Sequence, residues 1–258
     1  MSSRIAFIVE GAERERQVIR NMVKCFFSDY PKECFVLIAC KNIYMIWEKI
    51  NRDNGFTNII ELMREENDKN KNTLKGMSRE DFESVYLFFD LDFQQNNLPG
   101  NPKLMDRLKI VSDMMNTFCN ETEHGLLYIS YPMLEAVRDQ QRGPCLPTTF
   151  CRYPVEELVD YKKNSSRIQN HIGHFGGYNI SDWKQIIRFF LYRVFCLLKV
   201  SPPTNCTNYK HKKVTPAIIY DEVKKIIIHE NKIFVLSAFP EFLLDYFNDS
   251  YWENMNGK

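Results

Sequence analysis

The feature that most constrains the fold is an alternation of short apolar blocks and amphipathic stretches along the first half of the chain. Short apolar blocks that end at glycine or polar residues predict buried β-strands. Between them, apolar residues recur at helical spacing among charged ones. Strands are expected near 4–11, 33–40, 84–92 and 125–132, and helices over 12–27, in two pieces within 42–67, and over 103–119. This alternation predicts an α/β fold with a mostly parallel four-stranded sheet flanked by helices.

The pattern changes after residue 143, where helical periodicity replaces the alternation. Apolar helical stretches cover 180–200, 215–229 and 237–247, and Ser181 and Thr215 stand where helix N-caps are expected. We therefore predict an α/β domain over 1–143 and an α-helical region over 144–258 packed on it. The polar stretch 67–81, rich in Asn and Lys, is expected to be a loop.

Composition narrows the class of protein without identifying a partner. The 258 residues include 34 basic and 33 acidic side chains, which leaves a formal charge of +1, so any basic surface must be local. No apolar run is long enough for a membrane helix or a signal peptide. Eight cysteines without a CxxC pair are expected to be reduced, mostly buried thiols. These features predict a soluble, cytoplasmic protein with no membrane partner.

Three acidic side chains follow two of the expected strands. Glu10 comes after the first strand and before Gly11, and Asp90 and Asp92 come at the end of the third. The i, i+2 spacing puts both aspartates on one side of an extended chain. The carboxyl ends of parallel strands meet at one edge, and carboxylate oxygens are the ligands that Mg²⁺ prefers. The sequence therefore predicts a site for a divalent metal, Mg²⁺ or Mn²⁺.

Other charged residues have an ordinary reading beside the functional one. Glu13 and Glu15 fall in a first helical turn, as Glu135 does after the fourth strand, and acids there commonly offset the helix dipole. A short basic stretch near Tyr209 is a candidate nucleic-acid-binding segment, although such runs are often solvated loops. Its lysines are Lys210, Lys212 and Lys213.

Taken together, "IVEG" after the first strand, "FFDLD" after the third and "YPMLEA" after the fourth resemble the Toprim domain. The closest variety is that of small Toprim proteins and overcoming-lysogenisation-defect nucleases from anti-phage and abortive-infection systems. The resemblance covers roughly residues 4–140, about half of the chain. It implies that Glu10, Asp90 and Asp92 hold divalent metal, and that the glutamate also takes part in proton transfer during strand cleavage.

The resemblance extends to further positions and to partners. The family's second acid in the glycine turn corresponds to Arg14 here, so the flanking Glu13 becomes the candidate ligand. The resemblance also implies a metal role for Glu135 in its P-x-x-E context and a transition-state role for Lys184. It implies an endonuclease acting on DNA or on RNA such as tRNA, and it leaves open a homo-oligomer. The chain has no P-loop, so an ATPase in such a defence system would be a separate ABC- or AAA-type partner.

Two alternatives stand beside the nuclease. "FFDLDFQ" also looks like the aspartyl nucleophile loop of haloacid dehalogenase-type phosphatases, but that loop usually lies near the N-terminus and carries a threonine where this chain has Gln94. The other alternative is a regulatory or interaction module that binds Mg²⁺ through the same acids without turnover.

Overall fold

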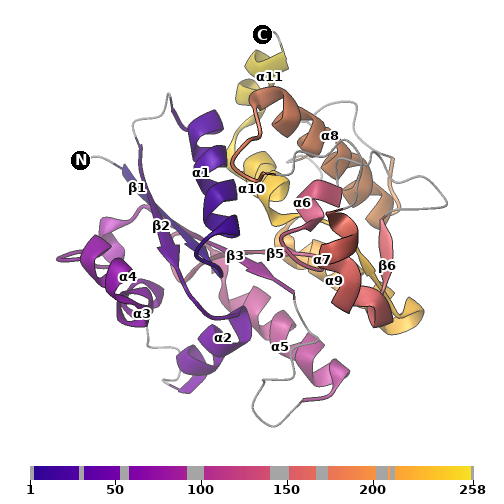
Figure 1. Ribbon diagram of the computed structural model, residues 1–258, viewed down its shortest axis with the longest axis horizontal. Coiled ribbons are helices and arrows are strands. Elements are labelled where there is room, and N and C mark those ends of the chain that lie inside the picture. The colour runs from indigo at the N-terminus through magenta and orange to yellow at the C-terminus, as the bar shows by residue number, and fades with distance from the viewer. Residues whose placement is uncertain are drawn as a thin grey trace. The chain divides into compact units, whose positions relative to one another are not determined.

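The computed structural model describes residues 3–28, 32–52, 58–91, 102–139, 151–166, 174–201, 209 and 213–256 (Figure 1). The chain forms two compact units, one made of residues 1–127 with 175–177 and the other of residues 128–174 with 178–258. The division falls at residue 127, within a strand, whereas the change of sequence pattern that suggested a domain boundary comes at residue 143.

A five-stranded sheet has the order β2-β1-β3-β5-β4. Its strands are β1 (Ser3–Val9), β2 (Lys32–Ile38), β3 (Ser84–Asp90), β4 (Cys119–Asn120) and β5 (Gly125–Ser130). Strand β1 pairs in parallel with both β2 and β3, and β4 pairs antiparallel with β5. The α/β class with a mostly parallel sheet is thus confirmed, as are the four predicted strands. The number of strands is not: β4, with two residues, is too short to show a periodic pattern.

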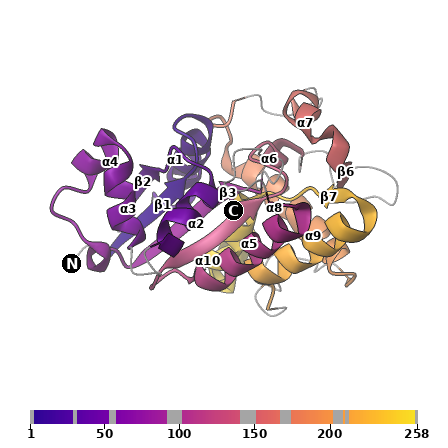
Figure 2. The same ribbon diagram turned by 90° about the horizontal axis from the view of Figure 1, so that it is seen from below.

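Helices connect these strands in the first unit. They are α1 (Arg14–Phe26), α2 (Ile43–Arg52), α3 (Ile59–Glu66), α4 (Asp68–Thr73), the 3₁₀ helix η1 (Arg79–Asp81) and α5 (Leu104–Thr117). Helix α1 lies between β1 and β2 in the chain, and α5 lies between β3 and β4. Figures 1 and 2 show α1 and α5 on opposite faces of the sheet.

The predicted loop over 67–81 is wrong, because α4 and η1 lie within it. Asn67 caps α4 by accepting a hydrogen bond from the N–H of Asn70. The buried Asn70 side chain donates to the C=O of Ile38 at 2.8 Å and accepts from its N–H at 3.2 Å. The amide group therefore acts as a neighbouring strand would for β2, an edge strand whose backbone groups need partners. Asparagines that suggested a loop are structural here.

The second unit is mainly helical but also contains a small sheet. Its elements are α6 (Ala136–Asp139), β6 (Arg152–Pro154), η3 (Val155–Glu157), α7 (Leu158–Ser165), α8 (Ile180–Leu197), α9 (Pro216–Glu230), β7 (Lys232–Phe234), α10 (Ala238–Tyr246) and α11 (Asp249–Asn256). The three long predicted helices are confirmed as α8, α9 and α10. The small sheet was not predicted: β6 and β7 pair antiparallel. Three-residue strands carry no recognisable period.

Helix caps were predicted correctly for α9 and incorrectly for α8. The Thr215 side chain accepts a hydrogen bond from the N–H of Ile218, and Pro216 begins the helix. At α8, Asn179 rather than Ser181 is the N-cap. Asn179 accepts from the N–H of Asp182, whose carboxylate accepts from the N–H of Asn179 in return. This reciprocal pair satisfies two backbone N–H donors, so Asn179 is a more favourable N-cap than Ser181, two residues later.

The cysteines depart from the expected reduced and mostly buried state. Cys40, Cys119 and Cys196 are exposed and not disulfide-bonded, whereas Cys151 is disulfide-bonded. Sequence spacing did not reveal this bond, because it does not determine which thiols meet in the fold.

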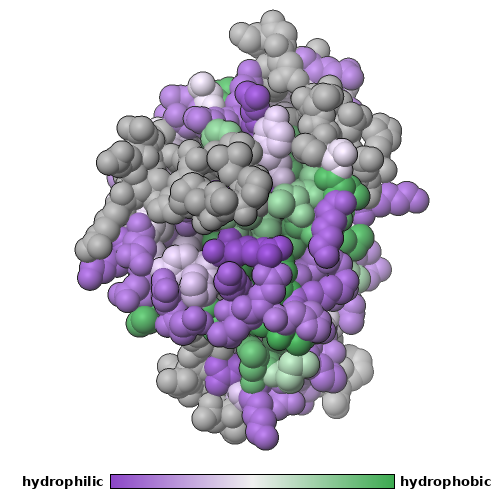
Figure 3. All heavy atoms as spheres, turned by 90° about the vertical axis from the view of Figure 1, so that its right-hand side faces the viewer, coloured by the Kyte–Doolittle hydropathy of each residue, from purple (hydrophilic) through white to green (hydrophobic). Residues whose placement is uncertain are grey.

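The surface shown in Figure 3 is mainly hydrophilic, with hydrophobic side chains visible in places among the charged ones. Scattered exposure of this kind is normal for folded proteins. None of the helices within the described ranges is long and apolar enough to cross a membrane.

A buried carboxyl group in the second unit should make stability depend on pH. Glu241 on α10 is 2% exposed, and among the described residues its Oε1 atom has no hydrogen-bond partner. Burial, and then the negative charge of Asp245, raise the pKa of Glu241 well above its usual value. The folded state therefore keeps a proton that the unfolded chain releases above about pH 4.3.

The sign of the effect follows from proton linkage. Because the folded state binds more protons, stability falls as pH rises above the unfolded pKa, by at most about 1.4 kcal/mol per pH unit. Glu241→Gln removes this contribution. We expect its free energy of unfolding, measured in denaturant, to exceed that of the wild type by a margin that grows from about pH 5 to about pH 7. A margin that stays constant with pH would contradict a neutral buried Glu241.

Candidate functional site

The two central strands of the sheet carry Glu10 and Asp90 to the same edge. Residues 5–9 of β1 are fully buried, and the chain becomes half-buried at Glu10; β3 is buried until Asp90. The parallel register pairs Val9 with Phe88, so the two acids follow neighbouring points of adjacent strands. Adjacent strands lie about 4.8 Å apart. The structure therefore brings these two predicted residues together at the carboxyl edge.

The backbone around Glu10 is held by the strand on its other side. The C=O of Glu10 accepts a hydrogen bond from the N–H of Cys40 at 3.0 Å, and the C=O of Val9 accepts from Ala39 at 2.8 Å. The chain bends at Glu10, so the regular pleat, which would direct Glu10 and Asp90 to opposite faces, ends at Val9. The Oε2 atom of Glu10 is buried. These contacts hold Glu10 in place at the carboxyl edge.

Glu15 lies closest to the glycine turn among the acids that follow Glu10. A Cβ atom at Gly11 would come within 2.4 Å of Glu15 Oε2, so the carboxylate covers the turn. Glu13, at the N-cap of α1, is exposed. Sequence reasoning favoured Glu13 because it is nearer along the chain. Glu15 belongs to the first turn of α1, whereas Glu13 is the residue before the helix.

A buried tyrosine fixes the chain between the two aspartates. The Tyr44 hydroxyl donates a 2.9 Å hydrogen bond to the C=O of Leu91, and both side chains are buried. Tyr44 belongs to the first turn of α2, which the Asn42 side chain caps by accepting from the N–H of Met45. Asp92 itself lies outside the described residues. Its neighbour Leu91 is nevertheless anchored where β3 ends.

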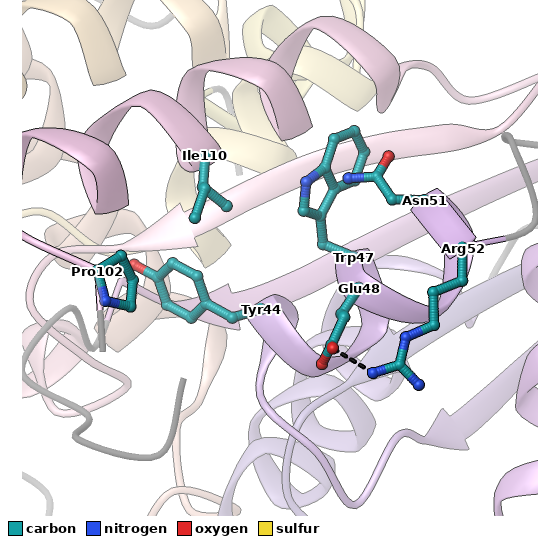
Figure 4. Close-up of a pocket in the computed structure, with 7 residues that line it drawn as sticks. All are labelled: Tyr44, Trp47, Glu48, Asn51, Arg52, Pro102 and Ile110. Atoms are coloured by element: carbon teal, nitrogen blue, oxygen red, sulfur yellow. Dashed lines mark hydrogen bonds and ion pairs between the residues drawn. The ribbon is translucent and has the colours of Figure 1, made fainter. Parts of the chain in front are cut away.

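A pocket of about 390 Å³ lies beside this anchor (Figure 4). One face of α2 supplies Tyr44, Trp47, Glu48, Asn51 and Arg52, whose spacing follows the i, i+3, i+4 pattern of a helix. Pro102 and Ile110 complete the lining. Sequence reasoning missed this pocket, although an aromatic and amide pair on one face of a short helix was visible in "IYMIWEKINR".

The remaining predicted residues belong to the second unit or lie outside the described residues. Glu135, directly before α6, is 3% exposed, and Lys184 is half-buried in the first turn of α8. Lys213 is exposed, just before α9, with a left-handed backbone (φ 51°). Lys210 and Lys212 lie outside the described residues.

The donors at the sheet edge suit a hard cation in type but form an incomplete set among the described residues. Glu10 and Asp90 offer carboxylate oxygens, which is the chemistry that Mg²⁺ and Mn²⁺ accept. Within the part of the chain that the structure describes, no group of three or more His, Cys, Asp or Glu side chains is arranged to hold a metal ion. The third predicted ligand, Asp92, falls outside that part. Two carboxylates can suffice for Mg²⁺, which keeps several waters.

Comparison with known proteins adds no relative: no protein-family model, no curated protein and no solved structure matches this chain.

Proposed function

We propose that the chain is a divalent-metal-dependent nuclease of the Toprim type, with its active site at the carboxyl edge of the sheet. The observation that carries the proposal is the register of β1 and β3. Glu10 directly follows β1, Asp90 is the last residue of β3, and the register puts these two positions at adjacent points. Carboxylate oxygens at adjacent strand ends are ligands of the hard oxygen type that Mg²⁺ and Mn²⁺ accept.

Each acid has a distinct part in the proposal. Glu10, Asp90 and Asp92 would hold Mg²⁺ or Mn²⁺, which neutralises the scissile phosphate and activates water when bound. Glu10, fixed by the backbone hydrogen bond from Cys40, would also accept or return a proton at the reacting phosphate. Tyr44 holds the backbone at Leu91, directly after Asp90, through its hydrogen bond to the Leu91 C=O.

The direct test is cleavage of plasmid DNA, single-stranded DNA and tRNA by the purified protein. We expect cleavage of at least one substrate in Mg²⁺ or Mn²⁺ and none in EDTA. Metal binding to the edge without cleavage of any substrate, also after addition of co-purifying proteins, would instead favour the regulatory module that binds Mg²⁺ without turnover.

The biological setting proposed for this activity is a toxic effector of anti-phage defence, controlled by a separate ATPase. It rests on the resemblance and on the lack of a P-loop in the chain. Co-purification of the tagged protein from its native host tests it. We expect an ABC- or AAA-type ATPase in the complex; recovery of the protein with no ATPase, in cells that show its toxicity, would contradict the proposed control.

The turn that holds Glu10 offers a comparison of two neighbouring acids. The Glu15 carboxylate covers Gly11, whereas Glu13 is exposed. We expect Glu15→Gln to lower the cleavage rate by about 10-fold or more, because its charge acts directly at the turn, and Glu13→Gln to lower it less. Rates under single-turnover conditions check this. A larger effect at Glu13 would make it the second ligand, as the sequence suggested.

A further inference from the structure

The pocket on α2 lies next to the proposed active site and shares a residue with it. Tyr44 lines the pocket and also donates to the C=O of Leu91, the residue between Asp90 and Asp92. A group held in the pocket is therefore one side chain away from the chain segment that carries the aspartates. The pocket therefore bears on which substrate binds, and not on how the metal is held.

The lining combines a flat aromatic surface with polar groups at one end. Trp47 is half-buried, and its ring packs edge-to-face on Phe118 with centroids 6.0 Å apart. Figure 4 shows the amide group of Asn51 beside the Trp47 indole, and Glu48 ion-paired with Arg52. An indole face stacks on bases of any type, and an amide presents both a donor and an acceptor to a base edge. A guanidinium group suits a neighbouring phosphate.

The size of the pocket restricts the occupant. A volume of about 390 Å³ lies at the small end of the range for ligand pockets. This volume suits one planar heterocycle, whereas the apolar face of a partner helix needs an extended groove. A base inside a duplex is stacked and paired, so an occupant of this kind must come from a single strand or a flipped nucleotide.

We propose that the Trp47 pocket binds one unpaired nucleobase of a single-stranded substrate, adjacent to the phosphate at the Glu10–Asp90 edge. The proposal rests on the proposed nuclease function for its substrate class. Stacking on Trp47 supplies affinity, Asn51 contacts the base edge, and Arg52 contacts the backbone. The enzyme would therefore prefer single-stranded DNA or RNA loops over intact duplex.

The test measures binding of a fluorescently labelled single-stranded octanucleotide in EDTA, where no cleavage occurs. We expect Trp47→Ala to weaken binding about 5- to 150-fold, the range for loss of one stacked base, and Trp47→Phe to stay near the wild type. Met45→Ala, an exposed α2 side chain that does not line the pocket, is the matched control and should bind like the wild type. Should Trp47→Ala fail to fold, the exposed Arg52→Ala replaces it, with about 5-fold weaker binding and a shallower salt dependence.

A set of octanucleotides with a single abasic position separates stacking from a general structural effect. One abasic position should weaken wild-type binding by the same factor as Trp47→Ala, and it should have no further effect in that variant. Undiminished sensitivity to that position in Trp47→Ala, or wild-type affinity in both Trp47→Ala and Arg52→Ala, would overturn the proposal. Failure of the nuclease function is distinguishable: no variant would then cleave in Mg²⁺, whereas binding in EDTA would still depend on Trp47.

Discussion

Glu10→Gln and Asp90→Asn are each expected to lower metal-dependent cleavage by about 10³-fold or more. Both changes keep the size of the side chain and remove one negative charge from the carboxyl edge. Loss of a ligand to the catalytic metal costs several kcal/mol of transition-state stabilisation, and each 1.36 kcal/mol is a factor of ten in rate. Because both residues are half-buried at strand ends and both changes keep the size of the side chain, the free energy of unfolding should change little.

The matched control is Glu123→Gln. Glu123 is an exposed acid in the turn before β5. Two residues earlier, the C=O of Glu121 accepts a hydrogen bond from the N–H of Val85, at the start of β3. Glu123 therefore lies at the end of the sheet opposite to Asp90. Its cleavage rate should equal that of the wild type. Full activity in Glu10→Gln or in Asp90→Asn, with correct folding shown by circular dichroism, would contradict a metal site at the carboxyl edge.

The part of the site that the sequence predicted is the part that depends on strand order alone. Glu10 and Asp90 follow continuous apolar blocks, and parallel strands bring their carboxyl ends to one edge whatever the side chains do. The long helices were equally accessible, since α1, α5, α8 and α9 bury one face at the helical period. Periodicity and topology are local signals, so they survive in a single sequence.

The features that the sequence did not predict depend on contacts between distant segments. In the sequence, Asn70 looks like a loop residue. Its side chain bonds both backbone groups of Ile38, which is 32 residues away. Tyr44 looks like a core aromatic residue, but its hydroxyl donates a hydrogen bond to the C=O of Leu91, which is 47 residues away. The β6–β7 pair joins Arg152 with Phe234. Such pairs leave no periodic trace, because each partner is an ordinary residue in its own neighbourhood.

A buried polar cluster in the second unit shows the same limitation and has a large expected effect on stability. We define the α6 polar cluster as Glu135, Arg138, Asp139, Tyr161 and Arg193. Arg193 is 0% exposed on α8, in a stretch that reads as plainly apolar. Its guanidinium donates to the C=O of Asp139 at 2.7 Å and to the C=O of Val235 at 3.2 Å. It therefore joins three separate segments of the unit.

The acids of the α6 polar cluster give Arg193 an electrostatic role as well. The Tyr161 hydroxyl donates to the Asp139 carboxylate at 2.6 Å, and Glu135 and Asp139 are 3% and 4% exposed. Burial, and then the Asp139 charge, raise the pKa of Tyr161 well above its usual value, whereas the Arg193 charge acts in the opposite direction. The arginine thus offsets buried negative charge that water cannot reach.

Arg193→Ala is expected to lower the free energy of unfolding by about 3–5 kcal/mol, because it leaves the buried C=O groups of Asp139 and Val235 without this donor and opens a cavity. Denaturant unfolding measures this, and Trp183 on the same helix, 0% exposed, reports it by fluorescence. Arg188→Ala is the matched control: Arg188 is exposed on α8 and lies 6.0 Å from the Tyr192 ring, an interaction worth about 0.5–1 kcal/mol. Equal losses in the two variants would mean that the α6 polar cluster does not depend on Arg193 for its stability.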